Sequence, residues 1–253
     1  MSLKIQSDKG FALIIGNWQY PGFSRHKTFR DAVRNDCLQL LLMLKEKNIN
    51  YKFLENVNLP EIQQAIRQIQ NTIETPKFIF TYFSGHGSLC FRKINYKIDD
   101  VFTTVQEIDD CIICNNGDSL AISNIIDEFD SLHAKNLQNI PKIFIFDCCR
   151  GDDDNSVLCK PGPAAAAAGS MATNFTSVKT DILIAFSTIR GSYALADKRL
   201  AHSVFTYYFI QEFKNNSKDI DIGLKNVEEK IRSYRLGKLS QTPEIRRISF
   251  PKN

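Results

Sequence analysis

The sequence predicts an α/β protein built around a mainly parallel sheet with helices on both faces. Short apolar runs alternate with stretches that carry apolar residues at helical spacing, and this alternation continues along most of the chain. Several of the apolar runs end in glycine or polar residues, as buried strands do where they leave a sheet. With 253 residues, of which 43% are hydrophobic, the chain can bury an ordinary core.

The first third of the chain predicts a β-α-β-α-β series. Its strands are short apolar runs bounded by turn residues, and its helices carry an apolar stripe. The predicted elements are, in order, a strand at 11–15, a helix at 32–47, a strand at 51–54, a helix from about 59 to 75 and a strand at 77–83. Such consecutive parallel strands bring their carboxyl ends to one edge of a sheet, where open sheets of this kind place their sites.

The rest of the chain continues the pattern after a turn signal at 115–118. The predicted elements are a helix at 122–129, a strand at 142–146, a strand at 181–187, helices at 203–215 and 222–234, and a short last strand at 245–250. Residues 151–180 break the alternation with three aspartates, a Pro-Gly-Pro run and five alanines. This composition is typical of a linker.

Composition excludes several classes of partner. The net charge of +4 is spread along the chain, and no basic run is interleaved with aromatics, so we expect no nucleic-acid binding. No apolar stretch approaches the roughly 20 residues that span a membrane, and residues 1–10 lack the apolar segment of a signal peptide. We therefore expect a cytoplasmic protein without a membrane partner, whose seven cysteines are thiols, including the lone C-x-x-C of Cys111 and Cys114.

Two short motifs close predicted strands and supply reactive side chains. The first is Phe83-Ser84-Gly85-His86-Gly87, and the second is Phe146-Asp147-Cys148-Cys149-Arg150-Gly151. A cysteine attacks a carbonyl carbon as the thiolate, and a nearby imidazole can take its proton and later protonate the leaving amine. The two motifs therefore predict acyl transfer, in the form of peptide hydrolysis.

Strand alternation separates the residues of the second motif. Cys148 and Cys149 fall on opposite faces, so one of them is expected to be a buried side chain. Asp147 shares the face of Cys149, and its carboxylate is expected to project toward the pocket for the residue before the scissile bond. An anion in that pocket favours a cationic side chain.

These residues together carry a family resemblance. In order and spacing the chain resembles the caspase, metacaspase and paracaspase superfamily of cysteine peptidases, through Ala12-Leu13-Ile14-Ile15-Gly16, Asn17, Tyr20-Pro21, Arg34-Asn35-Asp36, Ser84-Gly85-His86-Gly87 and Asp147-x-Cys149-Arg150-Gly151. The resemblance implies a caspase-like sandwich with a six-stranded sheet. It also implies a large catalytic part at 1–150, an inter-subunit linker at 151–180 and a small part at 181–253, whose start at 187–193 and end at 241–243 resemble those of caspase small subunits.

By the same resemblance, a Cys-His dyad performs the chemistry. Cys149, directly before Arg-Gly, matches the nucleophile, and His86 matches the general base and acid. The backbone amides of Gly87 and Cys149 match the oxyanion hole, whose donors stabilise the charge that develops on the carbonyl oxygen. No cofactor is required for this chemistry.

The resemblance also implies a substrate-binding surface. Asp36 and Asp147, with the hydroxyl of Ser84, match the acidic pocket of metacaspases and paracaspases, which cleave after arginine or lysine. Tyr193 and Leu195 match residues that line the next pocket. The backbone at Ala194 and Ala196 would pair with an extended peptide, which is recognition by strand addition.

Two alternatives stay open. Animal caspases hold a substrate aspartate with two arginines; Arg30 aligns with the first, but Ala196 stands at the second and cannot form a bidentate pair. A catalytically inactive caspase-like scaffold is the other alternative, against which both dyad residues are present. The resemblance itself implies regulatory proteolysis of protein or peptide substrates in cell death or defence.

Calcium, self-cleavage and assembly are further expectations from the resemblance. Many metacaspases require calcium, and Asp109 and Asp110 are the candidate ligands here, with the aspartates at 152–154 nearby. Lys160 and Lys179 are candidate self-cleavage points within the linker. The charged last segment with Pro251 favours a monomer over a caspase-like homodimer, because charges and proline blunt a sheet edge.

Overall fold

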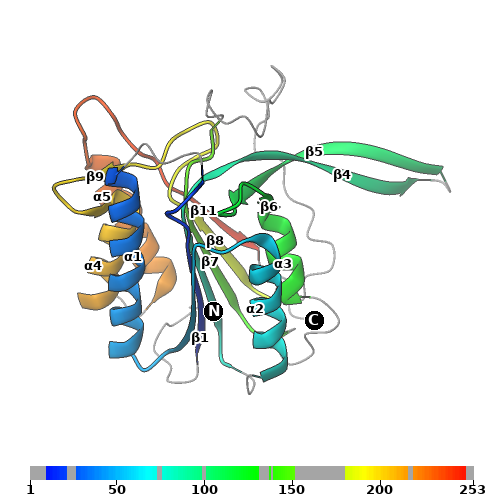
Figure 1. Ribbon diagram of the computed structural model, residues 1–253, viewed down its shortest axis with the longest axis horizontal. Coiled ribbons are helices and arrows are strands. Elements are labelled where there is room, and N and C mark those ends of the chain that lie inside the picture. The colour runs from blue at the N-terminus through cyan, green and yellow to red at the C-terminus, as the bar shows by residue number, and fades with distance from the viewer. Residues whose placement is uncertain are drawn as a thin grey trace.

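A six-stranded sheet flanked by helices on both faces organises the protein (Figure 1). The computed structural model describes residues 10–21, 27–72, 76–98, 101–130, 137, 139–151, 180–215 and 219–248. The predicted α/β class and the mainly parallel sheet are both confirmed. No helix in these ranges is long and apolar enough to cross a membrane.

The strand order of the main sheet places the last strand of the chain at one edge. From that edge the strands are β11 (Glu244–Ile248), β8 (Ile182–Phe186), β7 (Lys142–Asp147), β3 (Ile79–Ser84), β1 (Phe11–Gly16) and β2 (Asn50–Glu55). Only β11 runs antiparallel to its neighbour. Strands β3, β7 and β8 are buried along their whole length, which explains why they read as continuous apolar runs in the sequence.

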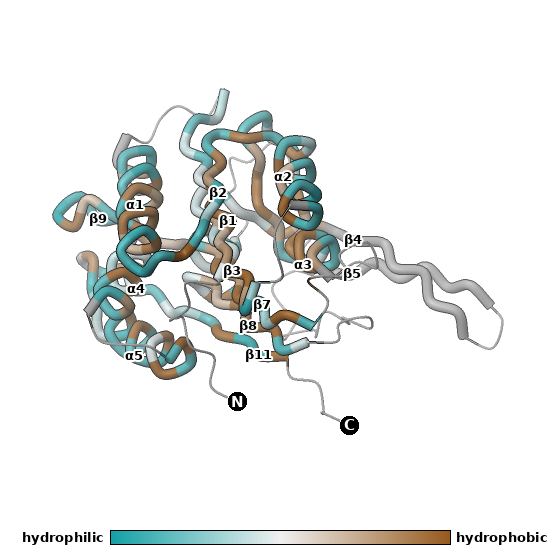
Figure 2. The backbone as a smooth tube through the Cα atoms, turned by 90° about the horizontal axis from the view of Figure 1, so that it is seen from below, coloured by the Kyte–Doolittle hydropathy of each residue, from teal (hydrophilic) through white to brown (hydrophobic). Residues whose placement is uncertain are grey.

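Helices cover the two faces of the sheet and enclose two separate cores. One face carries α1 (Lys27–Glu46), α4 (Val204–Asn215) and α5 (Ile220–Ser233), and the other carries α2 (Leu59–Thr72) and α3 (Ile122–Asp130) (Figure 1). The central strands are apolar, whereas the helices have an apolar and a polar side (Figure 2). Every strand and helix that the sequence predicted is present. Their ends are shifted by a few residues, and α1 begins earlier than expected.

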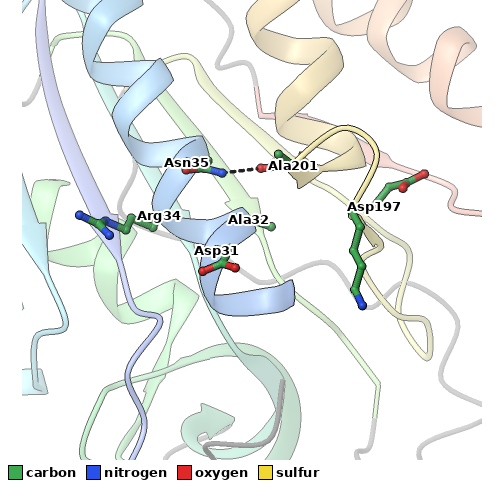
Figure 3. Close-up of a pocket in the computed structure, with 7 residues that line it drawn as sticks. Asp31, Ala32, Arg34, Asn35, Asp197 and Ala201 are labelled. Carbon is green, nitrogen blue, oxygen red and sulfur yellow. Dashed lines mark hydrogen bonds between the residues drawn. The ribbon is translucent and has the colours of Figure 1, made fainter. Parts of the chain in front are cut away.

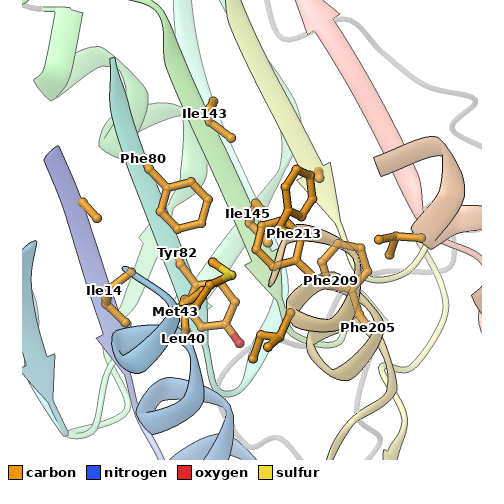
Figure 4. Close-up of a cluster of buried hydrophobic side chains, with 14 of the residues drawn as sticks. Ile14, Leu40, Met43, Phe80, Tyr82, Ile143, Ile145, Phe205, Phe209 and Phe213 are labelled. Carbon is orange, nitrogen blue, oxygen red and sulfur yellow. The ribbon is translucent and has the colours of Figure 1, made fainter. Parts of the chain in front are cut away.

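The core under α4 is rich in aromatic rings. Phe209 of α4 stacks on Phe80 of β3, with ring centroids 6.1 Å apart, and contacts Phe213 in a tilted arrangement, with centroids 4.5 Å apart (Figure 4). All three rings are buried. Because α4 begins directly after the residues that face the candidate site, this packing fixes the position of that end of the helix.

The sequence analysis predicted no strands between His86 and the third helix, and this was wrong. A three-stranded antiparallel sheet lies there, made of β4 (Gly87–Ile98), β5 (Val101–Ile113) and β6 (Ser119–Ala121). The β4–β5 hairpin extends away from the main sheet (Figure 1). Strands β4 and β5 follow one another without a helix between them and pair with each other. The alternation of strand and helix on which the prediction relied is therefore absent from this part of the sequence.

A second small hairpin also was not predicted. It consists of β9 (Ala196–Asp197) and β10 (His202–Ser203), which pair antiparallel directly before α4. The predicted linker lies almost entirely outside the described residues, since 152–179 are not among them. The strands on either side of it, β7 and β8, are parallel neighbours, so the two predicted parts of the chain share one sheet.

Truncation of Phe209 tests the role of the aromatic core. We expect Phe209→Ala to lower the free energy of unfolding by about 3–5 kcal/mol, because it leaves a cavity between two rings. Leu42→Ala is the matched control, since Leu42 is 51% exposed on α1 and its loss should cost no more than about 0.5 kcal/mol. Urea unfolding measures both; equal losses for the two variants would contradict this account of the core.

Candidate active site

His86 lies two residues beyond the end of β3 and is fixed through both its backbone and its ring. Its N–H donates to the hydroxyl of Tyr20 at 2.9 Å, and its carbonyl oxygen accepts from the N–H of Ile113 at 2.9 Å. The imidazole stacks on Phe29, with centroids 4.3 Å apart, and contacts Tyr20 at 4.6 Å. The Tyr20 hydroxyl in turn donates to the carbonyl of Ile113 at 3.2 Å. Strand β5 and two aromatic rings therefore hold the histidine in one orientation.

Cys149 lies at the matching position on the neighbouring strand. Ser84 of β3 pairs with Asp147 of β7, so His86 and Cys149 each follow this pair by two residues. The two loops touch: a Cβ atom on Gly87 would lie 2.6 Å from the carbonyl oxygen of Cys149. Only glycine permits this approach, which brings the backbone after the histidine against that of the cysteine.

The two adjacent thiols have different surroundings. Cys148 is 2% exposed and belongs to the core cluster on the α2 and α3 side of the sheet. Burial raises the pKa of the Cys148 thiol well above its ordinary value, and the charges of Cys149 and Asp147 raise it further. Cys149 is only half-buried. Of the two thiols, Cys149 is therefore the one that a substrate can reach.

Arg150, directly after the cysteine, is a fully buried cation. Its Nε and Nη2 atoms form a bidentate pair with the two carboxylate oxygens of Asp110, each at 2.8 Å. Its Nη1 donates to the carbonyl of Thr188 at 3.0 Å and to Glu244 of β11. The guanidinium lies 3.8 Å from the ring centroid of Phe186. Four segments of the chain therefore converge on one side chain.

The backbone of Arg150 is tied down as well. Its N–H donates to the carbonyl of Ser192 at 3.0 Å, and its carbonyl accepts from the N–H of Gly191 at 2.8 Å. Arg190 adds a second guanidinium to Asp110, at 2.9 Å. Burial by itself raises the pKa of Asp110, but the hydrogen bonds and charges of the two arginines outweigh it and hold the pKa below its ordinary value.

The candidate calcium ligands are engaged with protein groups. Both carboxylate oxygens of Asp110 accept from arginines, and Asp109 accepts from the hydroxyl of Ser123. Within the described parts of the chain, no cluster of three or more His, Cys, Asp or Glu side chains is arranged to hold a metal ion. The aspartates at 152–154 lie outside those parts. Calcium binding stays a prediction.

The two carboxylates of the predicted acidic pocket meet at Ser203. The N–H of Ser203 donates to the oxygens of Asp36 at 3.2 and 3.3 Å, and its hydroxyl donates to Oδ2 of Asp147. Thr206 donates to the same Oδ2 atom at 2.6 Å. Asp36 and Asp147 are 0% and 3% exposed. Ser84, the third predicted residue, is buried directly opposite Asp147 in the strand register.

The electrostatics of this pocket are unbalanced. No Lys or Arg of the described residues contacts either carboxylate, and Oδ1 of Asp147 is buried without a hydrogen-bond partner. Burial raises the pKa of Asp36 to about 7; a hydrogen bond from His202 opposes this, and the charge of Asp147 adds to it. Burial likewise raises the pKa of Asp147, against hydrogen bonds from Ser203 and Thr206. Among the described residues, the pocket holds two acidic groups and no Lys or Arg.

The predicted substrate-binding loop has mixed surroundings. Tyr193 is 53% exposed, whereas Leu195 packs into the core under α4. The Leu195 N–H donates to the side chain of Gln241 at 2.9 Å, and its carbonyl accepts from Val204 at 2.8 Å. Ala194 is half-buried, and Ala196 is paired with a residue of β10. The exposed Tyr193 and the backbone of Ala194 are thus the parts of this loop that a peptide can reach.

An open cavity of about 500 Å³ lies beside the acidic pocket, between α1 and the turn of the β9–β10 hairpin (Figure 3). The Asn35 side chain crosses it, donating to the carbonyl of Ala201 at 2.9 Å. Charges of both signs line it, from Asp31 and Arg34 on the helix and Lys198 on the turn. The cavity shares the helix and the hairpin with the acidic pocket, while Asp36 itself points inward.

Several residues of the site were not predicted from the sequence. They orient the histidine or contact the two carboxylates, and they are Phe29, His202, Ser203 and Thr206, while Tyr20 was noted only for its place in the family pattern. A signal was available for the polar three. Two buried carboxylates require hydrogen-bond donors, and His202 and Ser203 stand together before an apolar helix.

A histidine and a half-buried cysteine at the carboxyl ends of adjacent parallel strands, with their loops in backbone contact, define a class: cysteine peptidases of α/β fold. A sequence model of the caspase domain matches residues 9–253. The chain belongs to the caspase-domain family and is a cysteine-type endopeptidase that acts on protein substrates. None of the curated proteins is significantly similar to it. The closer likeness to metacaspases and paracaspases stays a prediction.

Gly87→Ala tests the contact between the two loops. The added Cβ would lie 2.5 Å from Cys148 Sγ and 2.6 Å from Cys149 O, so the loops must separate. We expect kcat to fall at least about 100-fold, because small displacements of reacting groups have effects of this size. Gly151→Ala is the control, since its Cβ would meet nothing closer than 3.5 Å. Peptidase assays decide; an active Gly87→Ala enzyme would contradict the close approach.

Asp110→Asn tests the buried ion pairs. The variant leaves the buried Arg150 without its bidentate anion, and we expect a loss of about 3–5 kcal/mol in the free energy of unfolding. Because the pKa of Asp110 is lowered in the fold, its contribution is present above the ordinary carboxyl range and is lost as the pH falls through the folded value. The difference between the variant and the parent should therefore shrink in acid.

Asp118→Asn supplies the control, because Asp118 is exposed in a turn. Denaturant unfolding between about pH 3 and pH 7 measures both variants. Equal stabilities of Asp110→Asn and the parent near pH 7 would show that the ion pairs contribute nothing.

Proposed function

We propose that this endopeptidase cleaves proteins after arginine or lysine, with Cys149 as the nucleophile and His86 as the general base and acid. The observation that carries the proposal is the pair of buried carboxylates, Asp36 and Asp147, which lack an arginine or lysine partner among the described residues. The unpaired Oδ1 atom of Asp147 supports it further. A substrate guanidinium or ammonium would supply the missing cation.

The reaction proceeds by covalent catalysis. His86 takes the proton of the Cys149 thiol, the thiolate attacks the carbonyl carbon, and the imidazolium then protonates the leaving amine. Water hydrolyses the resulting thioester with His86 again as base. The amides of Gly87 and Cys149 lie where two loops meet and would bind the oxyanion of each tetrahedral intermediate.

Charge decides the specificity of the pocket. Two buried carboxylates attract a basic side chain in a medium of low dielectric constant, whereas a substrate aspartate would add a third negative charge. Arg30, the residue on which an aspartate-specific alternative depends, is exposed in the first turn of α1 and contacts neither carboxylate. This arrangement supports basic over acidic specificity.

Matched peptides test the proposal directly. Fluorogenic substrates that end in Arg, Lys or Asp are incubated with the protein and with Cys149→Ala, with and without calcium. We expect turnover of the Arg and Lys peptides only, and none by the variant, because the thiol is the nucleophile. Preferred cleavage after Asp would refute the pocket assignment. Absence of Cys149-dependent cleavage in every condition would mean that the chain acts as a scaffold.

Asp147→Asn tests the pocket separately from the dyad. The amide keeps the size of the side chain but removes its charge, and we expect kcat/KM for an Arg peptide to fall by roughly 30-fold or more. Asp31→Asn is the control, since Asp31 is an exposed acid on the same helix as Asp36. Equal effects of the two variants would show that overall charge, and not the pocket, governs recognition.

A further inference from the structure

Among the described residues, His202 is the one ionisable side chain that contacts a carboxylate of the acidic pocket by a hydrogen bond. Its Nδ1 atom lies 2.7 Å from Oδ1 of Asp36. The Asp36 side chain is 0% exposed, and that of His202 is 16% exposed. An ionised carboxylate only accepts hydrogen bonds, so Nδ1 carries the proton whenever Asp36 is ionised. The remaining partner of Asp36 is the N–H of Ser203.

In the part of the chain that the structure describes, the other groups around this pair do not supply a positive charge. Asp147 at the end of β7 places a second acid nearby, and Cys37 and Tyr82 face the carboxylate from α1 and β3. The ring of Tyr207, on α4, lies 6.1 Å from that of His202. Burial holds both the Cys37 thiol and the Tyr82 phenol neutral by raising their pKa values. The ionisation of Asp36 therefore depends on His202 more than on any other side chain.

We propose that His202 is a positioning residue for substrate selection: by its hydrogen bond it holds Asp36 ionised, and it thereby sets the pH above which the pocket prefers a cationic side chain. The inference rests on the proposed specificity for arginine or lysine. His202 need not touch the substrate for this role, because it acts through Asp36.

The sign of the pH dependence follows from the state of Asp36. Burial raises its pKa to about 7, against the hydrogen bond from His202. Below that pH the carboxyl group is neutral and attracts a cation weakly; above it the group is an anion. The preference for arginine should therefore increase as the pH rises through neutrality, and loss of His202 should move that increase to higher pH.

A ratio of two substrates isolates the pocket from the dyad. Peptides that end in arginine and in citrulline, its neutral isostere, share the same Cys149 and His86 chemistry. The ratio of their kcat/KM values cancels the titration of the dyad and reports the charge of the pocket. In the parent enzyme we expect this ratio to rise about tenfold between about pH 6 and pH 8, as the ionised fraction of a group titrating near 7 does.

Three variants complete the experiment. His202→Ala should shift the midpoint upward by roughly one pH unit, so that the ratio falls about fivefold at pH 7 but less than about twofold at pH 9. His202→Asn keeps an N–H donor in a similar place and should shift it less. Asp36→Asn should give a low ratio that does not vary with pH. Circular dichroism confirms that each variant folds, and His202→Asn carries the test if the alanine variant does not.

The outcomes separate this inference from the function on which it rests. If His202→Ala lowers the ratio by the same factor at every pH, His202 has only a structural role and the inference is overturned. A ratio that still rises with pH in Asp36→Asn would assign the titration to another group and overturn it as well. A parent enzyme that prefers citrulline or aspartate at every pH would refute the basic specificity itself.

Discussion

The register between β3 and β7 is the constraint on which the site depends. Ser84 pairs with Asp147, and His86 and Cys149 each follow this pair by two residues. Side chains alternate between the faces of a sheet, so a slip of one residue would turn the aspartate and the cysteine away together and bring Cys148 into their place. The alternation is enforced by burial, because the strands are covered on both sides. One ladder of backbone hydrogen bonds thus sets the positions of both the Cys149 thiol and the Asp147 carboxylate.

The acidic pocket shows how a fold can keep two carboxylates in its interior. Three of their donors come from one short stretch, in which His202 and Ser203 form β10 and Thr206 lies in the first turn of α4. The aromatic core between α4 and the sheet holds this stretch against the sheet. The donors satisfy most of the carboxylate oxygens but cancel no charge completely, so the interior stays attractive to a cation. The packing of α4 against the sheet is in this way connected to the arrangement of donors around Asp36 and Asp147.

Sequence reasoning predicted the main sheet because buried parallel strands appear in the sequence as continuous apolar runs. The helices between them appear as segments with an apolar side and a polar side. It could not predict the β4–β5 hairpin, whose strands pair outside that sheet and leave no alternation with helices. The positions of Asp36 and Asp147 were predicted by family likeness, and both are buried. The partners of Asp36 were missed because His202 lies 166 residues away in the chain, and only the packing of α1 against β10 brings them together. Local patterns indicate that buried carboxylates need hydrogen-bond donors, but they do not tell which distant residues contact which carboxylate.

The buried arginine after the cysteine has a consequence for the integrity of the chain. Arg150 belongs to the stretch before residues 152–179, whereas Thr188 and Glu244, to which it donates, come after them. Strands β7 and β8, which flank the same stretch, are joined along their length. Covalent continuity is therefore not what unites the two halves. A cut between them would yield a tightly associated two-chain protein, with Cys149 on one chain and the donors His202, Ser203 and Thr206 on the other.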